Sequence, residues 1–124
     1  YMPKDEYIQR GKELAKLEGK SFNITNSPIE AAKNADVVFT DVWTSMGHET
    51  EEKERRKAFK GFQVNKEVMS YTKENALLLH CLPAHRGEEI TSEILEKHSN
   101  EIFDEAENRL HVQKAILVKL LKNN

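Results

Sequence analysis

Residues 76–83 read Ala-Leu-Leu-Leu-His-Cys-Leu-Pro, and in them the motif with the only cysteine of the chain follows a short apolar run. A short apolar run between polar turn-formers is typical of a buried strand. Open α/β sheets bind their ligands outside the carboxyl ends of the strands, so Cys81 lies where such a sheet would hold a ligand. The Leu82-Pro83 bond follows, and X-Pro bonds are the ones that adopt the cis form.

The segments on either side alternate between strand and helix patterns. Apolar runs at 35–40 and 101–103, and apolar alternation at 21–25, predict three more strands. Helical spacing and capping residues predict helices over 5–18 and 49–60, helices that begin near residues 28, 65 and 92, and a final helix from residue 108. This alternation predicts an α/β fold with an open, mostly parallel sheet and helices on both faces.

Composition limits the class of protein. With 124 residues the chain is long enough for one domain with a core, and its net charge of −2 gives no reason to expect nucleic acid or an anionic membrane. Its apolar stretches are too short to span a bilayer. A single cysteine excludes an internal disulfide and fits a reducing compartment, so we expect a cytoplasmic protein.

The sequence also suggests a piece of a longer protein. The predicted sheet is thin and lacks a clear first strand, and the first residue is Tyr1.

Three polar clusters follow three of the predicted strands, at 41–47, 80–87 and 104–109. In a parallel sheet, the carboxyl ends of the strands lie at one edge, so the three clusters can converge on one cleft. Their common position favours a functional site more than any one cluster does.

Cys81 allows several interpretations. A lone cysteine is often a buried, inert thiol. His80, His85 and Arg86 are close in sequence, and positive neighbours lower a thiol pKa, which would suit a nucleophile or a proton acceptor. The Cys-His pairing also suggests a cysteine hydrolase, although no oxyanion loop or orienting Asn or Asp can be assigned from the sequence.

Asp41 and the residues behind it suggest an amino-acid ligand. Asp41 is either the polar residue that ends a strand or a carboxylate that pairs with a ligand ammonium. The loop Ser45-Met46-Gly47 is either an ordinary loop or one that turns backbone N–H groups towards an anion. An ammonium site beside a carboxylate site is what an α-amino acid requires.

Arg109 is predicted to open the last helix. It could form an ion pair with Glu105 or Glu107. A cation in a first turn is poorly placed against the helix dipole, however, and near Cys81 it could polarise a carbonyl or hold a phosphate oxygen. Both interpretations stay open on these grounds.

Metal and cofactor sites are not expected. His80 and His85 lack the helical spacing of zinc enzymes, and no acidic partner is obviously placed. No Gly-rich phosphate loop is present in the sequence. The charged run 51–57 is most simply a solvated helix face with i,i+4 pairs.

Three motifs resemble those of the ornithine carbamoyltransferases, in the family's order and at similar spacing. They are Asp-Val-Trp-Thr-Ser-Met-Gly at 41–47, His-Cys-Leu-Pro at 80–83 and Glu-Ala-Glu-Asn-Arg at 105–109. The resemblance covers nearly the whole chain. It implies that residues 1–124 are the ornithine-binding domain, a Rossmann-like half of a two-domain carbamoyltransferase, incomplete at its N-terminus and without the carbamoyl phosphate-binding domain.

The resemblance implies a role for each matching residue at the ornithine end of the site. Asp41 and Ser45 would bind the α-amino group of L-ornithine, and the backbone of Met46 would help to hold its carboxylate. Cys81 would be the catalytic proton acceptor near the side-chain amine.

At the carbamoyl phosphate end, the resemblance implies that a cis Leu82-Pro83 bond directs the Leu82 carbonyl, together with Cys81, onto the carbamoyl group. Arg109 would be the second catalytic residue, in contact with carbamoyl phosphate and with the charge that develops on the carbonyl oxygen. No cofactor is implied.

The implied reaction transfers the carbamoyl group of carbamoyl phosphate to ornithine, giving L-citrulline and phosphate in arginine metabolism. The family's Ser-x-Arg-Thr-Arg and His-Pro-x-Gln motifs are not in this sequence, so we expect no turnover from the isolated chain. The intact enzyme would be a homotrimer or a multiple of one. Two alternatives remain, a carbamoyltransferase for putrescine or acetylornithine, and a non-catalytic α/β binding module.

Overall fold

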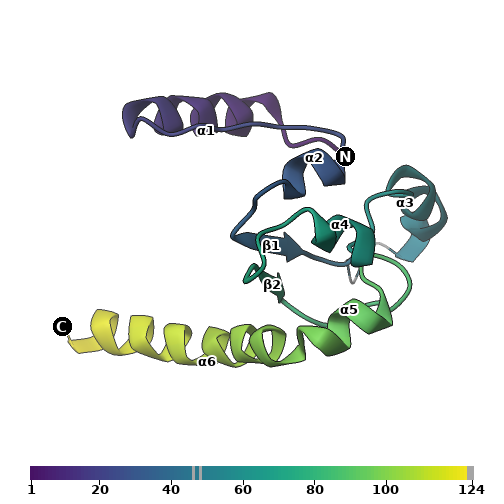
Figure 1. Cartoon of the computed structure of the whole chain (residues 1–124). Coiled ribbons are helices and arrows are strands. Elements are labelled where there is room, and N and C mark those ends of the chain that lie inside the picture. Colours follow the sequence, from purple (N-terminus) through teal and green to yellow (C-terminus); the bar gives the residue numbers. More distant parts are fainter. Residues whose placement is uncertain (46, 48, 123–124) are drawn as a thin grey trace.

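The computed structural model describes residues 1–45, 47 and 49–122. Short helices and two strands form its first part, and one long helix forms its last part (Figure 1). In chain order the elements are α1 (Asp5–Leu17), α2 (Pro28–Ala32), β1 (Val37–Thr40), η1 (Glu49–Glu51), α3 (Glu52–Ala58), α4 (Lys66–Ser70), β2 (Leu77–His80), α5 (Ser92–Lys97) and α6 (Ser99–Lys122).

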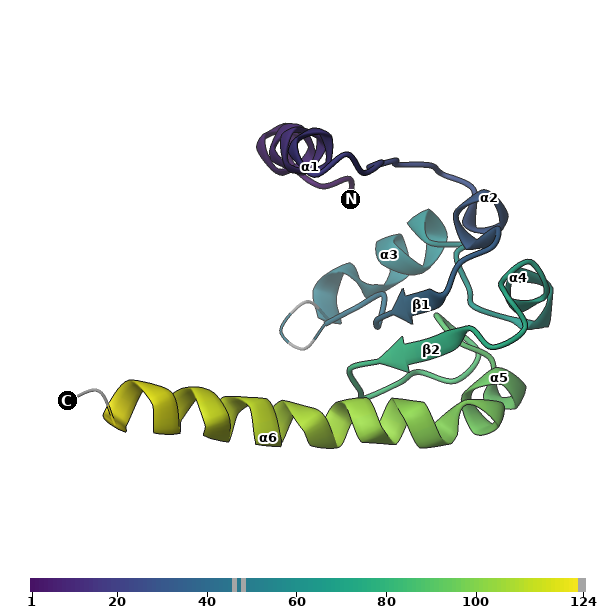
Figure 2. The same ribbon diagram turned by 60° about the vertical axis from the view of Figure 1, so that its left-hand side comes forward.

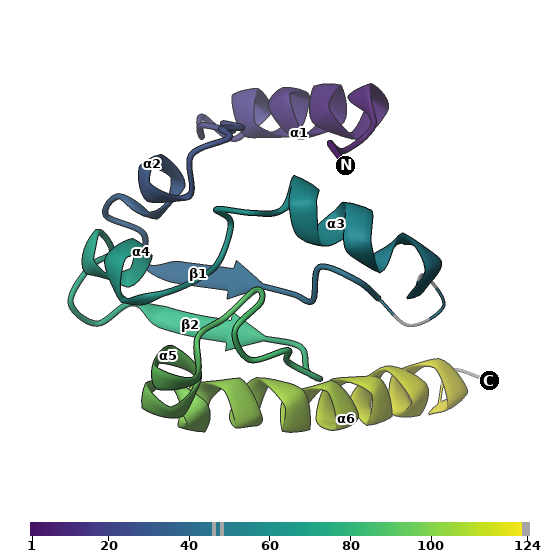
Figure 3. The same ribbon diagram turned by 90° about the vertical axis from the view of Figure 1, so that its right-hand side faces the viewer.

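The two strands form a parallel sheet in which Val37 pairs with Leu77 and Thr40 pairs with His80. Helix α3 lies on the β1 side of this sheet, and α5 and α6 lie on the β2 side (Figures 2 and 3). The predicted α/β fold with an open, parallel sheet and flanking helices is therefore confirmed.

The prediction of four strands was wrong in two places. Residues 21–25 are extended but belong to no strand among the described residues, because β1 and β2 pair only with each other and leave 21–25 without a neighbour. Residues 101–103 lie inside α6. Helical spacing explains their burial: Ile102 is fully buried, whereas Phe103, one residue on, points away and is 58% exposed.

The core lies between the sheet and the helices α5 and α6. Six buried apolar residues from β2, from these helices and from two connecting segments pack together: Val64, Leu78, Ile90, Ile94, Leu95 and Ile102. Burial of each such side chain stabilises the fold by about 1.5–3 kcal/mol. This packing fixes β2 against α6, and so places the end of β2 beside the middle of the long helix.

Local sequence signals set several helix ends. The side chains of Ser27, Asn65 and Thr91 accept hydrogen bonds from the backbone N–H three residues on, as N-caps do. Helix α1 ends before Gly19, whose φ of +62° is the left-handed conformation common after helix ends.

Helix α1 and the second half of α6 lie away from this core (Figure 1). Helix α1 has no buried residue. It contacts the following segment at Gly11, which lies so close to the Phe22 ring that a Cβ atom on residue 11 would be 2.8 Å from that ring. Within the described residues, no helix is both long enough and apolar enough to cross a membrane.

Candidate active site

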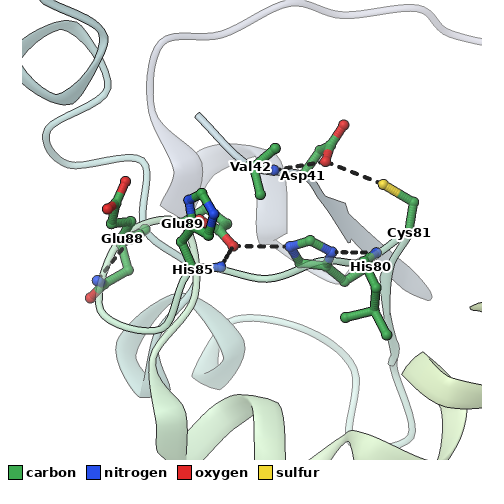
Figure 4. A network of polar contacts seen from close by, with 9 residues as sticks. Asp41, Val42, His80, Cys81, His85, Glu88 and Glu89 are labelled. Carbon is green, nitrogen blue, oxygen red and sulfur yellow. Dashed lines mark hydrogen bonds and ion pairs between the residues drawn. The ribbon is translucent and has the colours of Figure 1, made fainter. Parts of the chain in front are cut away.

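The site begins where the two paired strands end. Because Thr40 and His80 are partners in the sheet, the next residues, Asp41 and Cys81, leave it side by side. The Sγ atom of Cys81 donates a hydrogen bond to Oδ1 of Asp41 over 3.2 Å, and the same oxygen accepts one from the backbone N–H of Val42 over 2.7 Å (Figure 4). The predicted convergence of the first two clusters is thus confirmed.

The environment of Cys81 is more negative than the sequence suggested. Partial burial, the hydrogen bond to Asp41, and the charges of Asp41 and Glu105 raise the pKa of the Cys81 thiol, and Arg109 opposes this shift. The expectation that positive neighbours lower this pKa was therefore wrong, because a carboxylate rather than a histidine lies against the sulfur. The same hydrogen bond leaves the Cys-His interpretation of a hydrolase without support.

Arg109 reaches the cysteine motif from α6. Its Nη1 donates to the backbone carbonyl oxygen of Cys81 over 3.2 Å. Arg109 lies ten residues into a helix that begins at Ser99, so the prediction that it opens the last helix was wrong, and the argument from the helix dipole fails with it. The predicted proximity of Arg109 to Cys81 is confirmed. No ion pair joins Arg109 to Glu105 or Glu107 in the described part of the chain.

The loop behind β1 borders an open pocket. Ser45 is exposed, and together with Pro83 it lines a pocket of about 410 Å³ between the loops that follow β1 and β2. This volume is within the range of small-molecule sites. Met46 lies outside the described residues. Gly47 has a φ of +90°, a conformation that favours glycine.

Leu82 and Pro83 give the cysteine motif an unusual backbone. The Leu82-Pro83 bond is cis, as expected, and Leu82 has a φ of +52°, in the left-handed region that non-glycine residues rarely adopt. The N–H of Leu82 donates to Nδ1 of His80 over 2.9 Å.

The sequence analysis placed His80 in the cysteine motif but missed its partner Glu89, beneath this loop. His80 and Glu89 are fully buried, and His80 Nε2 lies 3.0 Å from Glu89 Oε1. A histidine at the end of an apolar strand, followed by a Glu pair at 88–89, was the available signal, but nothing in the spacing showed that the second glutamate turns inwards.

Two groups of side chains have atoms close enough together to share a metal ion: Asp41 with His80 and Cys81, and His85 with Glu88 and Glu89. Members of both groups already bind protein partners. Asp41 accepts from Cys81, Glu89 contacts His80, and Glu88 pairs with Arg56. Hydrogen bonds and ion pairs thus account for these clusters.

A second pocket, of about 450 Å³, lies beside β1 and α2 and extends to Trp43 and Phe59. Apolar side chains line most of it. Asp41 lines this second pocket as well, whereas Cys81 and Arg109 line neither of the two pockets.

Comparison with known proteins identifies the domain. Residues 1–120 match the family model of the aspartate/ornithine carbamoyltransferase Asp/Orn binding domain. The chain belongs to the aspartate/ornithine carbamoyltransferase family. A similar protein, the catabolic ornithine carbamoyltransferase of Thermoplasma acidophilum, is 50% identical over 121 residues, which are 98% of this chain and 40% of that protein.

Solved structures of carbamoyltransferases have the same fold. The anabolic ornithine carbamoyltransferase of Campylobacter jejuni superposes with a TM-score of 0.93 at 42% identity, over all of this chain and 41% of that one. An N-acetyl-L-ornithine transcarbamylase matches with a TM-score of 0.74 at 31% identity, over 97% of this chain and 37% of that one. This carbamoyltransferase domain thus spans about two fifths of the length of its relatives.

Proposed function

We propose that this Asp/Orn binding domain holds L-ornithine and works with a carbamoyl phosphate-binding domain to form L-citrulline and phosphate. One observation carries the proposal: Asp41, Cys81 and Arg109 converge at the carboxyl ends of two parallel strands, in a member of this family. A carboxylate, a thiol and a guanidinium are groups suited to an amine substrate and a carbonyl that gains charge.

In the proposed reaction, the neutral side-chain amine of ornithine attacks the carbonyl carbon of carbamoyl phosphate. A C–N bond forms, the carbonyl oxygen gains negative charge, and the C–O bond to phosphate then breaks. The amine nitrogen loses a proton, for which we propose Cys81 as the acceptor. Arg109, with its guanidinium at the Cys81 carbonyl, would stabilise the oxyanion and contact carbamoyl phosphate, and the carbonyl of Leu82 would orient the carbamoyl group.

Asp41 and Ser45 would hold the α-amino group of ornithine, and the backbone of Met46 would bind its carboxylate. This arrangement also gives Asp41 a second effect. A bound ammonium would offset the charge of Asp41, which is one of the groups that raise the pKa of the Cys81 thiol. Ornithine binding would therefore favour the thiolate form that a proton acceptor requires.

We propose ornithine rather than acetylornithine as the substrate because the relatives named ornithine carbamoyltransferase are the more similar ones, at 50% and 42% identity against 31%. Both anabolic and catabolic enzymes are among these relatives. We propose that the carbamoyltransferase with this domain acts in the cytoplasm. The free thiol of Cys81 supports this location, because disulfides are rare in that compartment.

The experiment is calorimetry on the carbamoyltransferase that contains this domain. Asp41→Asn should weaken ornithine binding at least tenfold and leave carbamoyl phosphate binding within about twofold, because only the ammonium partner is lost. Asp36→Asn is the matched control, since Asp36 precedes the same strand and pairs only with the exposed Lys73 among the described residues. Equal loss of both ligands with Asp41→Asn would contradict the assignment.

A further inference from the structure

Glu89 is a fully buried carboxylate beneath the loop that carries the proposed catalytic groups. A buried carboxylate is costly unless hydrogen bonds satisfy it. Among the described residues only Oε1 of Glu89 has hydrogen-bond partners, while Oε2 is buried without one. The partners of Oε1 therefore indicate what the side chain does.

One oxygen of Glu89 binds both ends of the cysteine loop. Its Oε1 lies 3.0 Å from Nε2 of His80 and accepts a hydrogen bond from the backbone N–H of His85 over 2.6 Å (Figure 4). His80 and His85 flank residues 81–84, so a single atom joins the start of this loop to its end. Cys81 and Leu82 lie between the two contacts.

The contacts of His80 fix its tautomer. The backbone N–H of Leu82 donates to Nδ1 of His80 over 2.9 Å. An N–H group can only donate, so Nδ1 carries no proton, and the proton of the ring is on Nε2, where it donates to Glu89. The carboxylate thus selects the form of His80 that can accept from Leu82.

Leu82 needs this support because of its backbone. A φ of +52° is unfavourable for a residue with a side chain, and such conformations persist where the surrounding contacts hold them. The hydrogen bond from Leu82 to His80 is such a contact. The direction of the Leu82 carbonyl follows from the same backbone.

We propose that Glu89 is a positioning residue of the carbamoyl transfer site, which acts through His80 to fix the backbone of Leu82 and the loop that carries Cys81. Its catalytic consequence rests on the proposed function. Its effect on the loop does not, so the two parts can be tested separately.

The first test uses this chain alone and compares Glu89→Gln with Glu88→Gln. Glu88 is the neighbouring glutamate, but its carboxylate pairs with Arg56 instead of His80. Nitrogen-15 NMR should find the wild-type His80 ring protonated on Nε2. Glu89→Gln should speed hydrogen exchange of the Leu82 amide at least tenfold relative to that of Leu78 in the core, whereas Glu88→Gln should change this ratio less than twofold.

The comparison with Leu78 separates local release of the loop from a general loss of stability, which would speed exchange at both amides. An unchanged exchange ratio in Glu89→Gln would overturn the proposal. If Glu89→Gln does not fold, the wild-type spectrum decides, because a His80 ring protonated on Nδ1 would overturn it as well.

The second test measures steady-state kinetics of the carbamoyltransferase that contains this domain. Glu89→Gln should lower kcat about tenfold to a hundredfold while the KM for ornithine stays within about twofold, since misplacement of a reacting group costs rate at constant binding. Glu88→Gln should leave both constants near the wild-type values. Unchanged kcat in Glu89→Gln would overturn the catalytic part. A wild-type enzyme without carbamoyl transfer would instead refute the proposed function, and the exchange result would still stand.

Discussion

The thiol of Cys81 donates to the carboxylate of Asp41 over 3.2 Å, and this contact joins the loops that follow the two strands. It also makes the thiol harder to ionise, since burial, the hydrogen bond and nearby carboxylates together raise its pKa. Because Cys81 is the only cysteine, every thiol measurement on this chain reports on this one group.

Asp41→Asn should lower the pKa of Cys81, because the substitution removes a negative charge beside the sulfur. Alkylation by iodoacetamide at pH 8 should then be about threefold to tenfold faster, since the thiolate fraction rises about tenfold for each unit by which the pKa falls. Asp36→Asn, at the other end of β1, should react at the wild-type rate. A slower or unchanged rate in Asp41→Asn would contradict the described contact.

Arg109→Gln should act in the opposite direction. Arg109 is the group that lowers the pKa of Cys81, so its loss should raise that pKa further and slow alkylation about twofold or more at pH 8. Arg10→Gln is the control, because within the part of the chain that the structure describes Arg10 pairs only with exposed Glu13 on α1. Faster alkylation in Arg109→Gln would show that the guanidinium lies away from the thiol in solution.

The contact of β2 with α6 can be tested through stability. Leu78→Ala should lower the free energy of unfolding by about 2–5 kcal/mol, because it leaves a cavity at a fully buried position. Leu121→Ala, at a position 71% exposed near the end of α6, should change it by less than about 0.5 kcal/mol. Urea unfolding followed by circular dichroism measures both. Similar losses for the two variants would argue against this core.

Glu101 makes stability depend on pH. Burial opposes ionisation of Glu101, but the hydrogen bond from His98, with other hydrogen bonds and the charge of His98, lowers its pKa overall. A lowered pKa stabilises the fold above the unfolded value of about 4.3, and this contribution is lost as the pH falls through the folded pKa.

Glu101→Gln should therefore cost about 1.5 kcal/mol at pH 7, and the difference from wild type should shrink below about pH 4. Exposed Glu74→Gln serves as the control and should show no such dependence. A difference that grows as the pH falls would have the wrong sign for this account.

The sequence predicted the parts of the fold that depend on local pattern. The strands at 37–40 and 77–80 and the capped helices follow from short apolar runs and from N-cap residues, and the structure has them. Segment 101–103 failed because a three-residue apolar run has no period that separates a strand from a buried helix face. Segment 21–25 failed because a strand exists only beside a partner, which local sequence does not supply.

The candidate site shows the same limit. The motif positions predicted that Asp41, Cys81 and Arg109 lie together, because each was expected to follow a strand and the carboxyl ends of parallel strands share one edge of a sheet. The direction of the pKa shift of the Cys81 thiol was missed, because it depends on which side chain lies against the sulfur. The inward turn of Glu89 was missed because only the packed loop determines it.

The most direct measurement of the central claim is the rate of carbamoyl transfer, followed as phosphate release, by the carbamoyltransferase that contains this domain, with ornithine, putrescine and acetylornithine compared at equal carbamoyl phosphate. We predict that kcat/KM for ornithine exceeds that for either other amine at least a hundredfold, and that Cys81→Ser lowers kcat at least a hundredfold in an enzyme that stays folded. Preference for another amine, or an unchanged kcat in Cys81→Ser, would contradict the account.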